Sequence, residues 1–402
     1  MLVSVIIPIR NEEKHIGITL DALLAQELYA KEYEFLVVDG MSTDNTREIA
    51  QRYADKYENI HLFENPKKLS SAARNIGVKN AQGEYILIVD GHCIIDNPNM
   101  LANAVKAFNS RTEGAGAKPD CLARPQPLEL DGATPLQLAV AAARRSRLGH
   151  HPDSFIYSGQ AQWCPASSAA IAYRKEVFDT IGYFDETFDA CEDVEFNTRI
   201  DKAELKCWFD PSIAVSYVPR NSLSGLFYQM FRYGKGRVKL FRKHPETFSL
   251  KTFGLGGFVA YVIFSFCLLC FLELFRISVS VIFSENIDFW YNSYYLGFSA
   301  GYTTHPYPLA STVCRYIEYA ELSGFVILYI VLAIYSIAVM LESVRLTLFM
   351  RNSALLRFRL LLNVPFVFIA IHFGFGLGIL RGLLCGQRCD TITAEENSNE
   401  LF

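Results

Sequence analysis

The sequence has little net charge, and this excludes one large class of partner. Among its 402 residues, 38 lysines and arginines nearly balance 42 aspartates and glutamates, which leaves a formal net charge of −4. Proteins that bind nucleic acid usually present a strongly basic surface, and no RNA- or DNA-reading motif occurs in the chain. The sequence therefore predicts no nucleic-acid partner.

Cysteines arranged for metal binding or disulfides are also lacking. The ten cysteines are scattered along the chain. Cys267 and Cys270 have the spacing of half a zinc site, but they lie in an apolar run and no second pair accompanies them. Isolated cysteines in apolar surroundings commonly behave as small hydrophobic side chains. We expect neither structural zinc nor disulfides.

The chain lacks a signal peptide and the familiar hydrolase and P-loop motifs. It opens directly on an apolar run, Leu2 to Pro8, without the basic start and cleavage site of a secretory leader. No serine–histidine–aspartate order, nucleophile elbow or P-loop occurs. The N-terminal part is therefore expected to stay in the cytoplasm.

Before residue 220, short β-rich runs alternate with amphipathic helical stretches. Near-continuous apolar strands separated by helices indicate an α/β domain with a parallel sheet covered on both faces. Polar residues collect just after the strands, where ligands bind in such sheets. Residues 110–135 are expected to form a flexible loop. Strands are predicted at Val3–Pro8, Phe35–Asp39, Ile60–Phe63 and Tyr85–Asp90, and helices at Glu13–Ala25, Thr43–Tyr57 and Leu69–Ala81.

After residue 220, three runs are long and apolar enough to cross a membrane, for which a helix needs about 20 residues. The third is the least regular, because it contains Asn363, Pro365 and His372. A shorter run, Ile277–Phe283, indicates the outer end of a broken helix or an interfacial segment. The three long runs are Phe253–Leu272, Leu322–Leu341 and Leu360–Leu380.

Basic residues are distributed unevenly around these runs. Seven lie between residues 232 and 251 and four between 345 and 359, against two in residues 273–321. Positively charged loops stay in the cytoplasm, so this bias predicts a multi-pass inner-membrane protein with a cytoplasmic catalytic domain. The expected organisation is a domain at 1–220, a basic amphipathic interface segment at 221–252, about three transmembrane helices at 253–385 and a tail at 386–402. An odd number of crossings places that tail outside.

Polar residues follow the first two predicted strands. Arg10 and Glu12 follow the first strand and Asp39 ends the second, so their side chains should meet where they can bond a base and ribose hydroxyls. The alternative is that Asp39-Gly40 and the segment from Ser42 to Asp44 are ordinary turn and helix-cap residues.

Asp90-Gly91-His92 follows the fourth predicted strand directly. A carboxylate and an imidazole two residues apart can converge on one divalent ion where the backbone turns, and Gly91 permits the turn. Mg²⁺ or Mn²⁺ there would bridge the phosphates of a sugar nucleotide, and the histidine favours Mn²⁺. The alternative is a simple turn.

Two further motifs carry charge. Glu192 and Asp193 follow an aromatic turn at 184–188. They could supply a general base for an acceptor hydroxyl, or they could begin a helix. The two interpretations are compatible. The segment 229–237, QMFRYGKGR, has two interpretations. It is an interfacial amphipathic helix only, or it is such a helix and also brings Arg232 to a diphosphate.

In order along the chain, five motifs resemble the inverting family 2 glycosyltransferases of the GT-A, Rossmann-like fold. The tail QMFRYGKGR and the trailing apolar runs look most like the membrane-associated, succinoglycan-type branch, which builds bacterial surface polysaccharides. The motifs are SVIIPIRNE at Ser4–Glu12, VVDGMSTDNT at Val37–Thr46, ARNIG at Ala73–Gly77, VDGH at Val89–His92, and YRKEVFDTIGYFDETF with the ED that follows at Tyr173–Asp193.

The resemblance implies a role for each matching residue. Asp90 and His92 occupy the place of the family's metal-binding DxD motif, and Asp193 that of the catalytic base. Arg232 lies in the place of the QxxRW motif of processive synthases, with Gln229 and Tyr233; these two and Glu192 would contact the acceptor or the diphosphate. The nucleotide, commonly UDP, would be bound by Pro8, Arg10, Glu12, Asp39, Asp44 and Arg74.

Two departures from the family pattern matter. His92 replaces the usual second aspartate, which leaves Mn²⁺ and Mg²⁺ both open, and Tyr233 replaces tryptophan, which argues against processive synthesis. The reaction expected is transfer of a sugar from a nucleotide sugar to a lipid-linked or growing glycan at the inner leaflet. The alternatives are a polyprenyl-phosphate glycosyltransferase, a processive synthase, and a non-catalytic nucleotide-sugar-binding subunit of a polysaccharide assembly complex.

Overall fold

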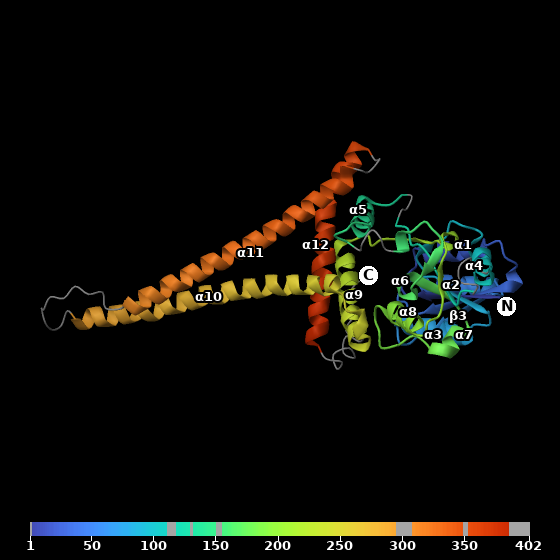
Figure 1. The fold of residues 1–402 in the computed structure, drawn as a ribbon, viewed down its shortest axis with the longest axis horizontal. Helices are drawn as coiled ribbons and strands as arrows, with labels where there is room; N and C mark the ends of the chain where they lie inside the picture. Colours follow the sequence, from blue (N-terminus) through green and yellow to red (C-terminus); the bar gives the residue numbers. More distant parts are fainter. Residues whose placement is uncertain are drawn as a thin grey trace.

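The protein is described from a computed structural model, which covers residues 2–110, 118–128, 132–149, 155–294, 308–348 and 353–385. Side chains of residues 279–294 and 308–314 are not described. The predicted tail, 386–402, lies outside the described residues. An α/β domain is followed by three long apolar helices (Figure 1), which confirms the expected fold class.

The helices and strands have the following bounds. The strands are β1 (Val3–Ile9), β2 (Tyr33–Asp39), β3 (Ile60–Glu64), β4 (Tyr85–Ile88), β5 (Cys93–Ile94), β6 (Cys121–Ala123), β7 (Gln162–Cys164), β8 (Ala170–Arg174), β9 (Cys207–Phe209) and β10 (Ser216–Tyr217). The helices are α1 (Ile16–Leu24), α2 (Thr46–Lys56), α3 (Ser70–Asn80), α4 (Met100–Asn109), α5 (Pro135–Arg144), α6 (Ala166–Ala169), α7 (Glu176–Ile181), α8 (Glu192–Lys202), α9 (Leu223–Lys243), α10 (Leu250–Tyr294), α11 (Pro308–Leu348) and α12 (Ala354–Leu384).

The domain is built on an eight-stranded sheet in the order β3-β2-β1-β4-β8-β6-β9-β7. The four predicted strands are confirmed and pair in parallel as expected. The expectation of a wholly parallel sheet is wrong, because β8 pairs antiparallel with β4 and β6, and β7 antiparallel with β9. The loop expected at residues 110–135 in fact contains β6. Strands β6, β7 and β9 have only three residues each, which is too short to show a periodic pattern in the sequence.

Both faces of the sheet are covered, which explains why its strands are continuously apolar. Alternate side chains of β1 point to opposite faces. Val5 packs with Leu20 of α1 and Leu101 of α4 in one core, and Ile6 packs with Ala73 of α3 in the other. The three predicted helices correspond to α1, α2 and α3. With both faces covered, the carboxyl ends of β1, β2 and β4 remain open to form a site.

Helix α12 lies along the α/β domain between it and the other two apolar helices (Figure 1). Leu360 and Phe368, in its first half, pack in one cluster with Ala139 of α5. Its second half runs beside α9, where a Cβ added at Gly378 would lie 2.1 Å from the Phe231 carbonyl oxygen. A Cβ at Gly234 of α9 would lie 2.2 Å from the Phe375 carbonyl. Glycine at these positions therefore lets the two backbones touch.

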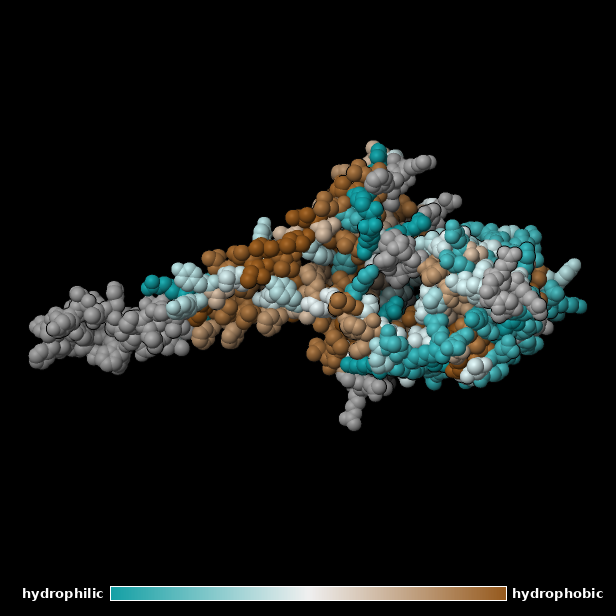
Figure 2. Space-filling view, viewed as in Figure 1, coloured by the Kyte–Doolittle hydropathy of each residue, from teal (hydrophilic) through white to brown (hydrophobic). Residues whose placement is uncertain are grey.

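Helices α10 and α11 form a hairpin that points away from the domain (Figure 1). Large apolar side chains cover its surface (Figure 2), and only 11% of each spanning window is buried. α10 runs without interruption through residues 277–283, so a helix break before this run, one of the two expected interpretations, is wrong. Just before this run, the Arg276 guanidinium bonds Glu273 of the same helix and lies 3.7 Å from Glu321 of α11.

The polar residues of α12 have a packing explanation. Half of its spanning window is buried by protein. The His372 side chain is bonded at Nδ1 to the Tyr335 hydroxyl of α11 (3.0 Å) and at Nε2 to the Leu148 carbonyl beyond α5 (2.7 Å). Asn363 donates to the Arg359 carbonyl one turn earlier. These groups are satisfied within the protein, where an unsatisfied polar group would be costly.

Candidate active site

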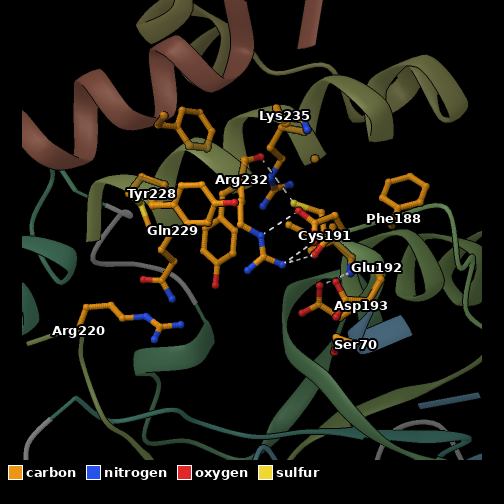
Figure 3. Close-up of a pocket in the computed structure, with 18 of the residues that line it drawn as sticks. Ser70, Phe188, Cys191, Glu192, Asp193, Arg220, Tyr228, Gln229, Arg232 and Lys235 are labelled. Carbon is orange, nitrogen blue, oxygen red and sulfur yellow. Dashed lines mark hydrogen bonds and ion pairs between the residues drawn. The ribbon is translucent and has the colours of Figure 1, made fainter. Parts of the chain in front are cut away.

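A cavity of about 2350 Å³ lies where the open strand ends face α9 and the apolar helices. Figure 3 shows part of it, with Arg232 and Gln229 entering from α9 and Asp193 from α8. Every residue predicted for the site lines the cavity except Asp39. The lining residues are Pro8, Arg10, Glu12, Asp44, Arg74, Asp90, His92, Glu192, Asp193, Gln229, Arg232 and Tyr233.

Asp39 lies behind the wall rather than on it. Its fully buried carboxylate accepts hydrogen bonds from the Ser42 amide (3.2 Å) and hydroxyl (2.5 Å), and Arg47 is 3.6 Å away. The neighbouring Gly40 reaches the cavity instead. Asp39 therefore shapes the turn after β2 as the turn interpretation describes, and its direct contact with a nucleotide stays a prediction.

The loops after β1 and β2 are tied together. Asn11 has a left-handed backbone (φ 55°), and its side-chain oxygen accepts a hydrogen bond from the Thr43 amide at 2.8 Å. The Asp44 carboxylate accepts hydrogen bonds from the amides of Thr46 (3.0 Å) and Glu13 (3.3 Å). Next to this junction, Arg10 lines the cavity, and its buried Nε has no partner among the described residues. A basic side chain thus faces the cavity from a fixed turn.

Glu12 and His92 form a pair across the strand ends, with 2.8 Å between the Glu12 carboxylate and His92 Nδ1. Burial lowers the pKa of His92, but the bond to Glu12 and the charges of Glu12, Tyr217 and Asp90 together outweigh burial and raise that pKa to about 10. His92 Nε2 is buried and has no partner among the described residues. This arrangement matches that of metal-binding histidines, which give one ring nitrogen to a carboxylate and the other to the ion.

A divalent ion fits this set of donors. No group of three or more His, Cys, Asp or Glu side chains converges in the described part of the chain. Nucleotide enzymes, however, hold Mg²⁺ or Mn²⁺ with one or two protein ligands and complete the shell with substrate phosphates and water. The Asp90 carboxylate is 38% exposed at the cavity wall, and His92 Nε2 would be the second ligand once the ion displaces its proton.

Arg74 places a buried cation among the acidic residues. Its Nη2 lies 3.3 Å from Glu192 and 4.0 Å from Asp90, while Nε and Nη1 have no partner in the described part of the structure. Burial would lower the pKa of Arg74, but the two carboxylates raise it. Burial raises the pKa of Glu192, and Arg74 offsets this only in part. The unpartnered donors of Arg74 can bind an anion.

Asp193 lies in the first turn of α8 and on the cavity wall, so the helix-start and general-base interpretations are compatible in the structure. Cys191, just before the helix, has a left-handed backbone (φ 64°) that turns the chain into α8. One Asp193 oxygen bonds the Val194 amide at 2.8 Å. Figure 3 shows its carboxylate beside that of Glu192, on the side facing Arg232. Its role as base remains a prediction.

Arg232 is held by an acidic residue that the sequence analysis missed. Its Nε and Nη2 bond the two oxygens of Asp189 at 2.9 and 2.8 Å, and Nη2 also bonds the Asp189 carbonyl. Burial would raise the pKa of Asp189, but the charge of Arg232 lowers it below its usual value. The two-point contact orients the guanidinium plane, and the side chain is still 35% exposed to the cavity.

The remaining α9 residues connect the two sides of the cavity. Gln229 donates to the Tyr217 hydroxyl at 3.0 Å, and the Tyr217 ring lies edge-on to His92, with 5.1 Å between ring centres. The Tyr233 carbonyl accepts a weak bond from Cys191 Sγ at 3.8 Å. Burial raises the pKa of the Tyr233 hydroxyl.

Sequence reasoning missed three arginines in the cavity wall. Arg144 ends α5, Arg147 follows it, and Arg220 follows β10. Figure 3 shows Arg220 across the cavity from Asp193. The run RRSR at 144–147 is the only sequence signal for the first two, and it does not resemble any motif used above.

The chain is similar in sequence to several known proteins. The model of the glycosyl transferase family 2 matches residues 4–121. The succinoglycan biosynthesis protein ExoA of Rhizobium meliloti is 31% identical over 60% of this chain and 70% of its own. A dolichyl N-acetyl-α-D-glucosaminyl phosphate 3-β-D-2,3-diacetamido-2,3-dideoxy-β-D-glucuronosyltransferase of Methanococcus voltae is 27% identical over 60% of this chain and 74% of its own.

Among solved structures, the S. aureus TarS fragment 1–349 in complex with UDP aligns with a TM-score of 0.42 and 23% identity. The alignment covers 58% of this chain and 64% of that one.

Proposed function

The chain belongs to glycosyl transferase family 2, and we propose that this enzyme of glycan biosynthesis moves a sugar from a UDP-linked donor to a lipid-linked glycan at the membrane surface. One observation carries the proposal. A single cavity joins the loops after β1 and β2, paired carboxylates, several arginines and the inner parts of the apolar helices. Such a cavity suits one polar and one amphiphilic substrate.

The donor end of the cavity suits a nucleoside diphosphate. Arg10, Arg74 and Arg232 enter it from three different elements, and guanidinium groups bind phosphate oxygens at two points. By resemblance to the family pattern, the nucleotide would be bound by Pro8, Glu12 and Asp44, which line the same cavity as these arginines. Asp39 would act there through the turn that it braces.

The chemistry proposed is a single displacement. An acceptor hydroxyl oxygen attacks the anomeric carbon of the donor, while the bond from that carbon to the diphosphate breaks and the diphosphate keeps its electron pair. Asp193 takes the hydroxyl proton. Arg232, oriented by Asp189, neutralises charge on the leaving diphosphate. Attack from the opposite face inverts the anomeric configuration.

Asp90 and His92 would hold the divalent ion, with Glu12 fixing the ring of His92. When bound, the ion would supply positive charge to the diphosphate oxygens. The choice between Mn²⁺ and Mg²⁺ is left to experiment.

The acceptor proposal rests on the far end of the cavity and on one relative. The Methanococcus voltae relative is named for a dolichyl phosphate-linked sugar as its acceptor. In this chain the cavity continues from Asp193 to Phe258, Tyr335 and Val339 of the apolar helices. The excess of basic residues around the inner ends of these helices supports a cytoplasmic catalytic domain at the inner membrane.

A donor panel tests the proposal. Membranes containing the chain would be incubated with UDP-, GDP- and dTDP-sugars and with lipid extract, and release of the nucleoside diphosphate measured. We expect release with a UDP-sugar, dependent on the lipid extract and absent from membranes carrying the Asp193→Asn variant. If no sugar nucleotide releases a diphosphate under any condition, the chain is instead a non-catalytic binding subunit.

A further inference from the structure

The cavity has two chemically different ends. Near Asp193 it is lined by carboxylates and cations. Toward the membrane helices its wall is aromatic and aliphatic, and the rings of Phe258 and Tyr335 lie 5.0 Å apart between their centres. This apolar wall comprises Leu255, Phe258, Tyr335, Ala338, Val339 and Phe375.

Three arginines, Arg144, Arg147 and Arg220, also line this cavity. Arg144 is half-buried and lines, with Tyr157 and Tyr233, a small recess of the same wall. Neither Arg144 nor Arg220 has a hydrogen bond or ion pair to any residue that the structure describes. A partly buried cation without a counter-ion is costly, so Arg144 calls for an anion from a ligand. The exposed Arg147 and Arg220 add positive charge to the same cavity.

The loop that carries two of these arginines is fixed to the apolar helices. The Leu148 carbonyl, next to Arg147, bonds His372 Nε2 of α12 at 2.7 Å, and His372 is bonded in turn to the Tyr335 hydroxyl of the apolar wall. The basic loop is thereby held at the edge of the apolar wall. An anionic group bound by the loop would have its hydrocarbon substituent against that wall.

We propose that Arg144, Arg147 and Arg220 bind the phosphate or diphosphate that joins the acceptor glycan to its lipid, and that the apolar wall holds the first hydrocarbon units of that lipid. The subsite deepens the proposed function and rests on it. It fits an amphiphile whose anionic group lies between sugar and hydrocarbon, because the cavity presents carboxylates, arginines and apolar side chains to one continuous space.

Binding to the purified full chain in lipid nanodiscs tests the subsite. The probes are farnesyl diphosphate, farnesol and inorganic diphosphate, with UDP at saturation to fill the donor end. Farnesyl diphosphate should bind at least tenfold more tightly than farnesol or inorganic diphosphate. Arg144→Gln and Arg220→Gln should each weaken it by about tenfold, the usual effect of losing a charged hydrogen bond. Ala338→Trp should weaken farnesyl diphosphate but not inorganic diphosphate.

UDP affinity, measured on the same samples, should stay unchanged and shows that each variant is folded. The matched control is Arg52→Gln, on the exposed side of α2. Equal affinity for farnesyl diphosphate and inorganic diphosphate would overturn the proposal. So would a farnesyl diphosphate affinity that neither Arg144→Gln nor Arg220→Gln changes. The donor panel could give no diphosphate release while farnesyl diphosphate binding still depends on the arginines. That combination would reject the proposed function and support the subsite.

A second inference rests on the packing of α12 alone. Its first half packs on α5 and its second half on α9, so it is docked on the catalytic domain along its length. Helix α9 is itself fixed to that domain through Arg232 and Asp189, and through Lys243 and Asp185. Six lysines and arginines lie between residues 232 and 243. If α12 crossed the hydrocarbon core, these charges would have to follow it, which is strongly unfavourable.

The other face of α12 presents a stripe of exposed apolar side chains at helical spacing: Leu355, Phe358, Leu362, Phe366 and Ile369. We infer that α12 lies in the plane of the membrane surface with this stripe in the lipid, and that only α10 and α11 cross. The tail 386–402 then lies on the side of the catalytic domain, contrary to the expectation from three crossings.

Labelling with a membrane-impermeant thiol reagent in intact cells tests this topology. Single-cysteine variants would be made at Glu204, Ser284 and Ser398 in a cysteine-free background. Ser284→Cys should be labelled in intact cells, and Ser398→Cys only after permeabilisation, like Glu204→Cys in the catalytic domain. Because removing all cysteines can impair folding, the wild-type chain would also be fused at its C-terminus to GFP or to alkaline phosphatase. Labelling of Ser398→Cys in intact cells, or phosphatase activity of the fusion, would overturn the inference.

Discussion

Asp193 combines a position at a helix start with exposure to the cavity, so one substitution separates the two roles. Asp193→Asn keeps the size and the bond to the Val194 amide but removes the proton acceptor. We expect kcat to fall by about 10²–10⁴-fold, the usual contribution of a general base, with little change in UDP affinity. Turnover within a few-fold of wild type would show that Asp193 only begins α8, or that the acceptor is a phosphate that needs no base.

The bond between Arg232 and Asp189 predicts that a lysine cannot replace this arginine. Arg232→Lys keeps the charge but loses the two-point contact, so kcat should fall by about tenfold or more. Asp189→Asn should also lower kcat, because the Arg232 guanidinium loses its charged partner. Steady-state kinetics would measure both, with Arg52→Lys as the control. An Arg232→Lys enzyme with wild-type kcat would remove Arg232 from the mechanism.

The metal assignment makes two predictions, of which the second does not depend on turnover. EDTA should abolish transfer, and Mn²⁺ or Mg²⁺ should restore it. Asp90→Ala should also lose Mn²⁺ binding in the presence of UDP, measured by electron paramagnetic resonance. The matched control is Glu48→Gln, because Glu48 is exposed on α2. Glu34→Gln is unsuitable as a control, because the buried Glu34 carboxylate accepts a hydrogen bond from Ser4. Full activity after chelation would contradict the assignment.

At the scale of elements, the contact between α9 and α12 depends on glycine. Gly378→Leu would place a side chain against the Phe231 carbonyl and force the helices apart, which should destabilise the protein by about 1–3 kcal/mol. Gly257→Leu is the matched control, since no atom lies within 4 Å of a Cβ there. Thermal unfolding in detergent would measure both. A Gly378→Leu midpoint equal to that of Gly257→Leu would show that the close packing contributes little.

The elements that sequence predicted well are those with a strong local pattern. Strands such as Val3–Ile9 are buried on both faces and read as continuous apolar runs, and the polar residues after them reach the cavity as expected. Asp39 did not, because the sequence cannot show that Ser42 and Arg47 would take its carboxylate. Asp189 was missed because its partner, Arg232, lies more than forty residues away in the sequence. Arg144 was missed because only the fold brings it to the cavity wall. Helix α12 is as apolar as a crossing helix, and only its packing sets it apart.

At the scale of the whole molecule, the cavity depends on the membrane part. A chain ended at residue 249 lacks α10, α11 and α12 and leaves the α12-facing side of α9, including Met230 and Val238, open to water. We expect it to aggregate on size-exclusion chromatography and to release no UDP. None of the described residues that line the cavity lies within 281–312. Deletion of this segment should therefore leave UDP release close to that of the wild type. A soluble, active chain ended at 249 would contradict this dependence.

The backbone contact of Gly234 and Gly378 also decides how this enzyme can be recombined with others. A designer who grafts the catalytic domain onto a foreign membrane anchor would naturally cut near residue 250, where the composition changes. That cut separates two helices whose backbones touch at these glycines. The exchangeable module is therefore discontinuous in sequence. Residues up to α9, helix α12 and the parts of α10 and α11 that line the cavity belong together, and only the outer part of the α10–α11 hairpin can be swapped.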